Sequence, residues 1–76
     1  MTIHEVIRSY RERVGISQRE LARRSRIPCR SICDWEAGKG NPTIERCIRI
    51  ARGLGITIGE LIADVSLPED EAVEER

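Results

Sequence analysis

Apolar residues recur every three to four positions along most of the chain, which is the spacing of amphipathic helices. This periodicity predicts five helices, over residues 3–14, 18–25, 29–37, 44–54 and 58–64. No stretch alternates apolar and polar residues over a useful length, so we expect no sheet. The predicted fold class is all-α: a five-helix domain over residues 1–65, followed by a short acidic tail over residues 66–76 that we expect to be flexible.

Residues that start and stop helices flank these segments. The spacing of a capping box, a hydroxyl followed three residues later by a carboxylate, occurs three times, at Thr2–Glu5, Ser17–Glu20 and Thr57–Glu60. Thr43 provides a fourth helix start just after Pro42. Glycines, which favour helix ends, follow the first, third and fourth segments at Gly15, Gly38 and Gly55.

The core must be small and mostly aliphatic, because the chain has 76 residues, no Phe, one Trp and one Tyr. The helical periodicity predicts which side chains face inward. They are Ile3, Val6, Ile7, Tyr10 and Val14 in the first helix, Leu21 and Ala22 in the second, Ile32 and Trp35 in the third, Ile44, Cys47, Ile48, Ala51 and Leu54 in the fourth, and Leu61 and Ile62 in the fifth.

The formal net charge is zero, but the charges are unevenly placed. Residues 1–65 hold twelve Arg and Lys against eight Asp and Glu, and residues 66–76 hold one Arg against five acids. Eleven of the twelve cations in the first part are Arg, whose planar fork of donors suits phosphates and guanine edges. The body is therefore basic. The simplest interpretation of the acidic segment is a solubilising terminus. The alternative is that it competes with phosphates for the basic surface or docks a partner protein.

Three cysteines, an odd number, do not predict a disulfide framework. The first residues lack the layout of a signal peptide, and no apolar run approaches the roughly 18 residues of a membrane span. We therefore expect a cytoplasmic protein.

A zinc site needs four ligands, and Cys29, Cys33, Cys47 and the distant His4 are the whole supply of soft ligands. We expect no metal and no cofactor, with thiol-based regulation at Cys29 left open.

The second and third predicted helices are short and joined by about three residues, as in a helix-turn-helix unit. In order, the chain gives SQRELA at 17–22, SI at 31–32, WE at 35–36, GK at 38–39, NPT at 41–43, RIARGLGI at 49–56 and GEL at 59–61. This series resembles the helix-turn-helix domains of the phage repressor and Cro type. The resemblance covers about residues 3–62. It implies a lambda-repressor-like fold that binds operator DNA, usually as a symmetric dimer.

The resemblance also implies roles for particular residues. Base-reading positions are matched by Cys29, Arg30, Cys33 and Asp34. Phosphate-binding positions are matched by Gln18, Lys39, Asn41 and Thr43. Ser17, Arg19, Arg23 and Arg46 join the phosphate-binding set, because they stand at the start of the second helix or flank the reading helix. An ion pair between the first and third helices is implied at Arg11 and Glu36.

Several of these residues have a second interpretation. Arg30 and Asp34 are four apart and can pair with each other instead of reading bases, and exposed arginines often form only a solvated face. Three residues depart from the family pattern. Arg26 replaces a common glycine in the turn, Pro28 stands where a hydroxyl cap is common, and Asp34 places a negative charge on the reading face.

Together these features predict a sequence-specific regulator of transcription, most simply a repressor that binds double-stranded operator DNA as a homodimer. We expect no enzyme, since there is no nucleophile–base pair and no phosphate-cradling loop. The alternative is a protein-interaction module on the same fold, such as an antitoxin or adaptor. The dimer interface is predicted at apolar residues near the end of the domain, which could instead close the core: Ile58, Ile62, Val65 and Leu67.

Overall fold

The computed structural model describes residues 1–66, and this range folds into five helices without a strand. In chain order they are α1 (Ile3–Val14), α2 (Gln18–Ser25), α3 (Cys29–Glu36), α4 (Ile44–Leu54) and α5 (Ile58–Ala63). The all-α prediction is confirmed, with α3 and α5 each one residue shorter than expected. None of these helices has the length and apolar character needed to cross a membrane.

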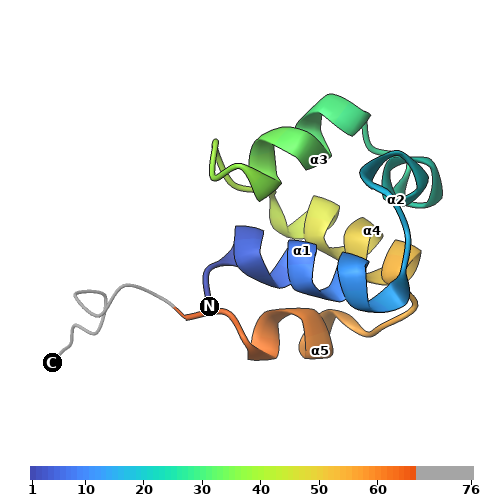
Figure 1. The fold of residues 1–76 in the computed structure, drawn as a ribbon. Coiled ribbons are helices and arrows are strands. Elements are labelled where there is room, and N and C mark those ends of the chain that lie inside the picture. The colour runs from blue at the N-terminus through green and yellow to red at the C-terminus, as the bar shows by residue number, and fades with distance from the viewer. Residues whose placement is uncertain (67–76) are drawn as a thin grey trace, which may run out of the picture.

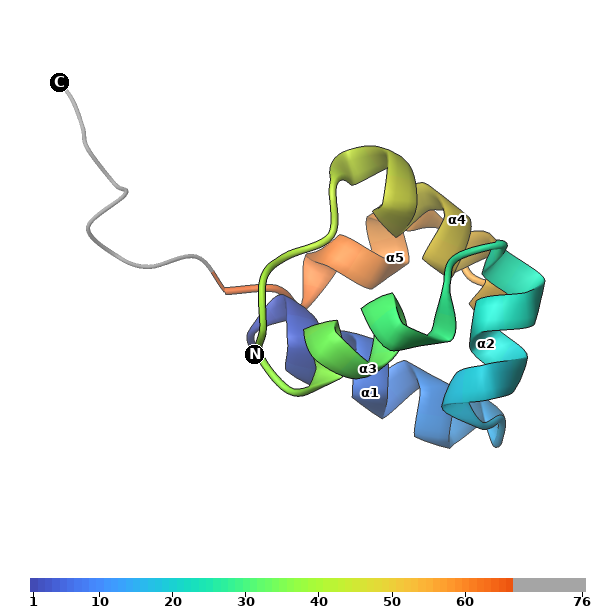
Figure 2. The ribbon, with the colours of Figure 1, turned by 90° about the horizontal axis from the view of Figure 1, so that it is seen from above.

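Helix α1 lies at the centre of the arrangement (Figure 1). It contacts α3, α4 and α5, while α2 packs on α3 and α4. Figures 1 and 2 show α3 as the outermost helix on the side of the domain opposite α5. The backbone N–H of Ser66 donates to the carbonyl oxygen of Met1 over 2.6 Å, so the end of the described chain returns to its start.

The predicted helix starts are present, with one correction. Thr2 and Thr57 form complete capping boxes with Glu5 and Glu60. At Ser17 only half of the box forms: Ser17 Oγ accepts from the Glu20 backbone N–H, but the Glu20 carboxylate binds Arg23 and Arg24 instead of reaching back. These charged donors on the next turn outcompete a neutral backbone N–H for the carboxylate.

The turn between α2 and α3 passes through Arg26, which adopts the left-handed conformation with φ of +58°. Its backbone N–H donates to the carbonyl of Ala22 and so closes the end of α2. This conformation costs an L-residue about 1–2 kcal/mol relative to a glycine. The departure from the common glycine at this position therefore leaves the turn in place but slightly strained.

The buried core contains the expected residues of α2 and α3, but the inward face of α4 differs from the prediction. Ile50 is fully buried, whereas Ile44 and Ile48 are exposed. Two overlapping stripes in α4 satisfy helical spacing, and the one that includes Cys47, Ile50, Ala51 and Leu54 faces the core. Val14 and Ile62 were also expected inward and are exposed, and Ile27 of the turn adds a buried side chain that was not expected.

Close contact between α2 and α4 explains which stripe of α4 is buried. Gly53 lies against α2, and a Cβ atom placed on it would stand 3.2 Å from Leu21 Cδ1 and 3.3 Å from Arg24 Cβ. The Arg24 guanidinium also donates to the carbonyl oxygen of Gly53 over 3.4 Å. The missing side chain lets the two backbones approach, and this approach fixes how α2, the first helix of the predicted DNA-binding unit, sits on the core.

Candidate nucleic-acid interface

The start of α2 presents backbone donors to solvent. Ser17 Oγ accepts from the Glu20 N–H over 3.0 Å, which leaves the N–H groups of Gln18 and Arg19 outside the helix's own hydrogen-bond ladder. Both groups point along the positive end of the helix dipole, which attracts anions. This end of α2 has the chemistry that a phosphate oxygen requires.

Helix α3 separates the residues that hold it from those that face outward. Ile32 and Trp35 are buried in the core, whereas Arg30 is exposed on the opposite side. Cys29, Cys33 and Asp34 are half-buried. Pro28 provides no side-chain cap, as its chemistry requires, and its carbonyl oxygen accepts from Ser31 and Ile32 instead. The outward face is therefore short and carries one long cationic side chain, Arg30.

A chain of side-chain hydrogen bonds ties α3 to α1 and α2. Arg11 Nε and Nη2 donate to the two carboxylate oxygens of Glu36 over 2.7 and 3.0 Å, and Arg11 Nη1 donates to the carbonyl oxygen of Ile16. Gln18 Nε2 donates to Glu36 Oε1 over 3.0 Å. The Cys33 thiol then donates to Gln18 Oε1 over 3.0 Å. We call these four side chains, Arg11, Glu36, Gln18 and Cys33, the bracing network.

Electrostatics support the bracing network. The Arg11 and Glu36 side chains are only 13% and 4% exposed, so their charges are largely removed from water. Hydrogen bonding to Glu36 raises the pKa of Arg11 above its ordinary value. Burial, with a smaller contribution from the neighbouring Cys29 thiol, raises the pKa of Cys33, so this thiol stays protonated and able to donate. Gln18 thus braces α3, while its backbone N–H stays free.

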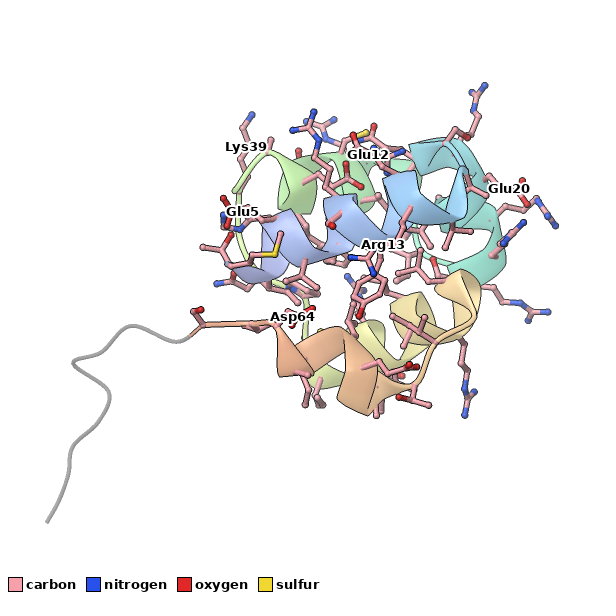
Figure 3. The ribbon with its side chains drawn as sticks, turned by 60° about the horizontal axis from the view of Figure 1, so that its bottom comes forward. Glu5, Glu12, Arg13, Glu20, Lys39 and Asp64 are labelled. Carbon is pink, nitrogen blue, oxygen red and sulfur yellow. The ribbon has the colours of Figure 1, made fainter. Side chains whose placement is uncertain are left out.

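The loop between α3 and α4 continues the same surface. Lys39, Asn41 and Thr43 are all exposed there, and the backbone N–H of Lys39 donates to the Asp34 carbonyl over 2.7 Å. Figure 3 shows the Lys39 side chain projecting from this loop away from α5. Thr43 accepts from the Arg46 backbone N–H and so starts α4. The loop is anchored at both ends, with its polar side chains directed to solvent.

The cations of this surface fall into two groups. Arg23 and Arg24 both bind Glu20, and their hydrogen bonds lower the pKa of Glu20 to about 2. Arg46 lies over the Trp35 ring, 5.9 Å from its centroid. Within residues 1–66, by contrast, the side chains of Arg19, Arg30 and Lys39 are exposed and have no hydrogen-bond or ion-pair partner, so they are available to an anionic ligand. The same is true of Arg26 and Arg52.

Two of these arrangements were not expected from the sequence. The Cys33–Gln18 hydrogen bond and the contact between Arg46 and Trp35 each join different helices, and no local pattern signals them. The possible pairing of Arg30 with Asp34 is not found among the ion pairs of residues 1–66. Arg30 is therefore free to contact something other than its neighbour on α3.

The predicted dimer residues differ in their surroundings. Ile58 and Val65 pack against the core, Ile62 is 46% exposed, and Leu67 lies outside the described residues. Ile62 borders an apolar groove of about 770 Å³ between the start of α1, the α3–α4 loop, α4 and α5. Its lining residues are Thr2, Ile3, His4, Asn41, Pro42, Cys47, Ile62, Val65 and Ser66. On α4, Ile44 and Ile48 are exposed, but neither lines this groove.

Comparison with known families identifies a helix-turn-helix domain. A family model described as helix-turn-helix matches residues 7–61, which is well over half of the chain. The match begins within α1 and ends in α5, so it includes all of α2, α3, α4 and the loop that carries Lys39. No curated protein matched the sequence.

Proposed function

The chain belongs to the helix-turn-helix family of DNA-binding regulators, and from that premise we propose that it is a repressor that occupies double-stranded operator DNA as a homodimer. Helix α3 enters the major groove, and the start of α2 and the α3–α4 loop hold the phosphate backbones on either side. Arg30 reads a guanine edge, and Asp34 accepts from a cytosine amino group. Cys29 and Cys33 contact base edges as small side chains.

The observation that carries this proposal is the position of the unpaired cations. Arg19, Arg30 and Lys39 come from α2, α3 and the following loop, and each is exposed without an intramolecular partner among residues 1–66. The bracing network holds α3 against α1 and α2 from its other side, so α3 is presented as a rigid element. Gln18 and Arg19 N–H groups, with Ser17, Asn41 and Thr43, supply further phosphate donors. Arg23 and Arg46 add positive charge at the flanks.

A dimer is proposed because one short reading helix contacts only a few base pairs. Ile62 and the apolar groove beside it form the proposed interface. Ile58 and Val65 support this surface from the core. Asn41 belongs both to the loop after α3 and to the groove wall, so the proposed interface adjoins the DNA-binding side without covering α3.

Salt dependence of binding tests the proposal. A dimer that contacts roughly 6–10 phosphates should lose about 10³–10⁵ in affinity between 50 and 200 mM salt, because binding releases condensed counterions. The ligand is selected from random duplex DNA, and the affinity of the selected site is measured by fluorescence anisotropy. Failure to select any sequence, or an affinity that barely changes with salt, contradicts DNA binding. It would favour the alternative, an antitoxin or adaptor that binds another protein through the same fold.

A further inference from the structure

Two thiols stand one turn apart on the outer part of α3. Cys29 and Cys33 are both free and both half-buried. The two residues are four apart on the same helix and therefore on one face of it, and burial, followed by the neighbouring Cys29 thiol, raises the pKa of Cys33. The third cysteine, Cys47, is buried in α4 and lies apart from them in the core. Neither the fold nor the bracing network requires a sulfur atom at position 29.

The spacing of these thiols excludes a disulfide between them but allows a metal ion to bridge the two sulfurs. Helix positions four apart have Cβ atoms about 5–6 Å apart, whereas a disulfide needs about 3.8 Å. A cation held linearly between two sulfurs with bonds of about 2.3 Å spans about 4.6 Å between those sulfurs. Rotation about the side-chain bonds of a residue pair at i and i+4 covers this distance. The pair can therefore hold a bridging ion where it cannot form a disulfide.

Because the site offers only two thiolate ligands, it suits only cations that accept two-coordinate binding. Within residues 1–66, no group of three or more His, Cys, Asp or Glu side chains is placed to hold a metal. A four-ligand zinc site is therefore not available in that part of the chain. Thiolates select soft cations, and Hg(II), Ag(I) and Cu(I) are soft ions that accept two ligands in a linear arrangement.

We propose that Cys29 and Cys33 form a two-thiolate site for a soft, linearly coordinating cation, and that its occupancy prevents α3 from reading DNA. Each thiol releases its proton to solvent as its sulfur–metal bond forms, and no oxidation state changes. The ion then lies on the flank of α3 beside Arg30, at the edge of the reading face. Binding also removes the S–H donor of Cys33 from Gln18 Oε1 and so opens the bracing network at its outer end. The effect on DNA rests on the proposed function, whereas the site itself does not.

Metal binding is tested first, without DNA, by titrating the whole chain with Hg(II) in the presence of excess competing monothiol. We expect one ion per chain and two monothiol molecules displaced from each ion, which take up the two protons that the protein thiols release. Cys29→Ser and Cys33→Ser should each lose about hundredfold or more in affinity, because the second thiol acts at high effective concentration. Cys47→Ala is the matched control and should bind like the wild type. Equal affinity in the two serine variants and the wild type, or a loss confined to Cys47→Ala, would overturn the site.

The second step repeats the DNA titration with and without Hg(II). The ion should weaken DNA binding of the wild type and of Cys47→Ala at least tenfold, and should leave the affinity of Cys29→Ser unchanged. If the ion binds the pair but DNA affinity stays the same, the regulatory half of the proposal is wrong. If the ion binds the pair and the metal-free protein binds no DNA, the proposed function fails and the site stands. If DNA binds but the ion does not, the site alone fails.

Discussion

The guanidinium of Arg11 spans both carboxylate oxygens of Glu36 and joins α1 to α3 through two nearly buried side chains. Removal of one partner leaves the other charge without compensation in a low-dielectric environment. We therefore expect Glu36→Gln to lower the free energy of unfolding by about 3–5 kcal/mol. Urea unfolding followed by circular dichroism measures this change.

The matched control is Glu12→Gln, because Glu12 pairs with Arg8 on the exposed side of α1. That pair is more than half exposed at both ends, so its loss should change stability by at most about 1 kcal/mol. Equal losses in the two variants, or an unchanged stability of Glu36→Gln, would show that the bracing network does not hold α3.

Acid should weaken the domain partly through Glu20. Its pKa falls from 4.5 to about 2, because Arg23 and then Arg24 donate hydrogen bonds to its carboxylate. A lowered pKa in the folded state contributes stability above pH 4.5 that is lost as pH falls toward 2. The melting temperature of the wild type should exceed that of Glu20→Gln at neutral pH, and the two should converge over this range. A difference that persists at pH 2 would contradict the assignment.

The close approach of α2 and α4 predicts opposite effects for two similar substitutions. Gly53→Ala places a methyl group 3.2 Å from Leu21 Cδ1 and 3.4 Å from the Ser25 backbone nitrogen. We expect a net loss of about 1–2 kcal/mol, because overpacking outweighs the higher helix propensity of alanine. Gly59→Ala in α5 meets only Thr57 Oγ1 at 3.8 Å and should stabilise by up to about 1 kcal/mol. Thermal unfolding that gives both changes the same sign would contradict this account.

Arg30 and Lys39 should affect DNA recognition in different ways. Arg30→Ala should cost about 1–3 kcal/mol at one base position and relax the preference there, because it removes a contact to a base edge. Lys39→Ala should weaken all sequences alike and make the salt dependence shallower, because it removes a phosphate contact. Affinities for the selected site and for scrambled duplexes separate these effects. Identical losses on both kinds of DNA would remove α3 from base reading.

Ile62 tests the proposed dimer interface. Ile62→Asp places a charge beside the apolar groove and should convert dimer to monomer without loss of helicity. Val14→Asp is the control, since Val14 is a comparably exposed apolar residue on α1 that does not line the groove. Sedimentation velocity measures assembly, and circular dichroism checks the fold. An Ile62→Asp protein that still dimerises would move the interface elsewhere.

Local signals in the sequence predicted the helices well. Hydroxyl caps begin α1, α2, α4 and α5, and glycines end α1 and α4. These effects act over only a few residues. The half-formed box at Ser17 could have been anticipated, because Arg23 and Arg24 stand three and four residues after Glu20 and compete for its carboxylate. When the groups that compete for a side chain lie within one helical turn of it, the sequence alone shows which hydrogen bond to expect.

Contacts between helices were harder to predict. The choice between Ile48 and Ile50 as the buried residue of α4 depends on how closely α2 approaches Gly53, which periodicity alone does not encode. The resemblance to repressor domains suggested the Arg11 and Glu36 positions, but nothing in the sequence indicated that Cys33 would donate to Gln18. Base-reading roles on α3 remain proposals, because they depend on a ligand and not on the fold.

The bracing network divides α3 into a part that is held and a part that is free to vary. Within residues 1–66, the side chains of Arg30 and Asp34 take part in no hydrogen bond or ion pair, whereas Glu36 and Cys33 do. In the proposed complex with DNA, exchange of residues 30 and 34 would therefore change which operator is preferred without loosening the scaffold. Such a division makes new specificities accessible through single substitutions, and it makes this small domain a practical starting point for retargeting by directed evolution.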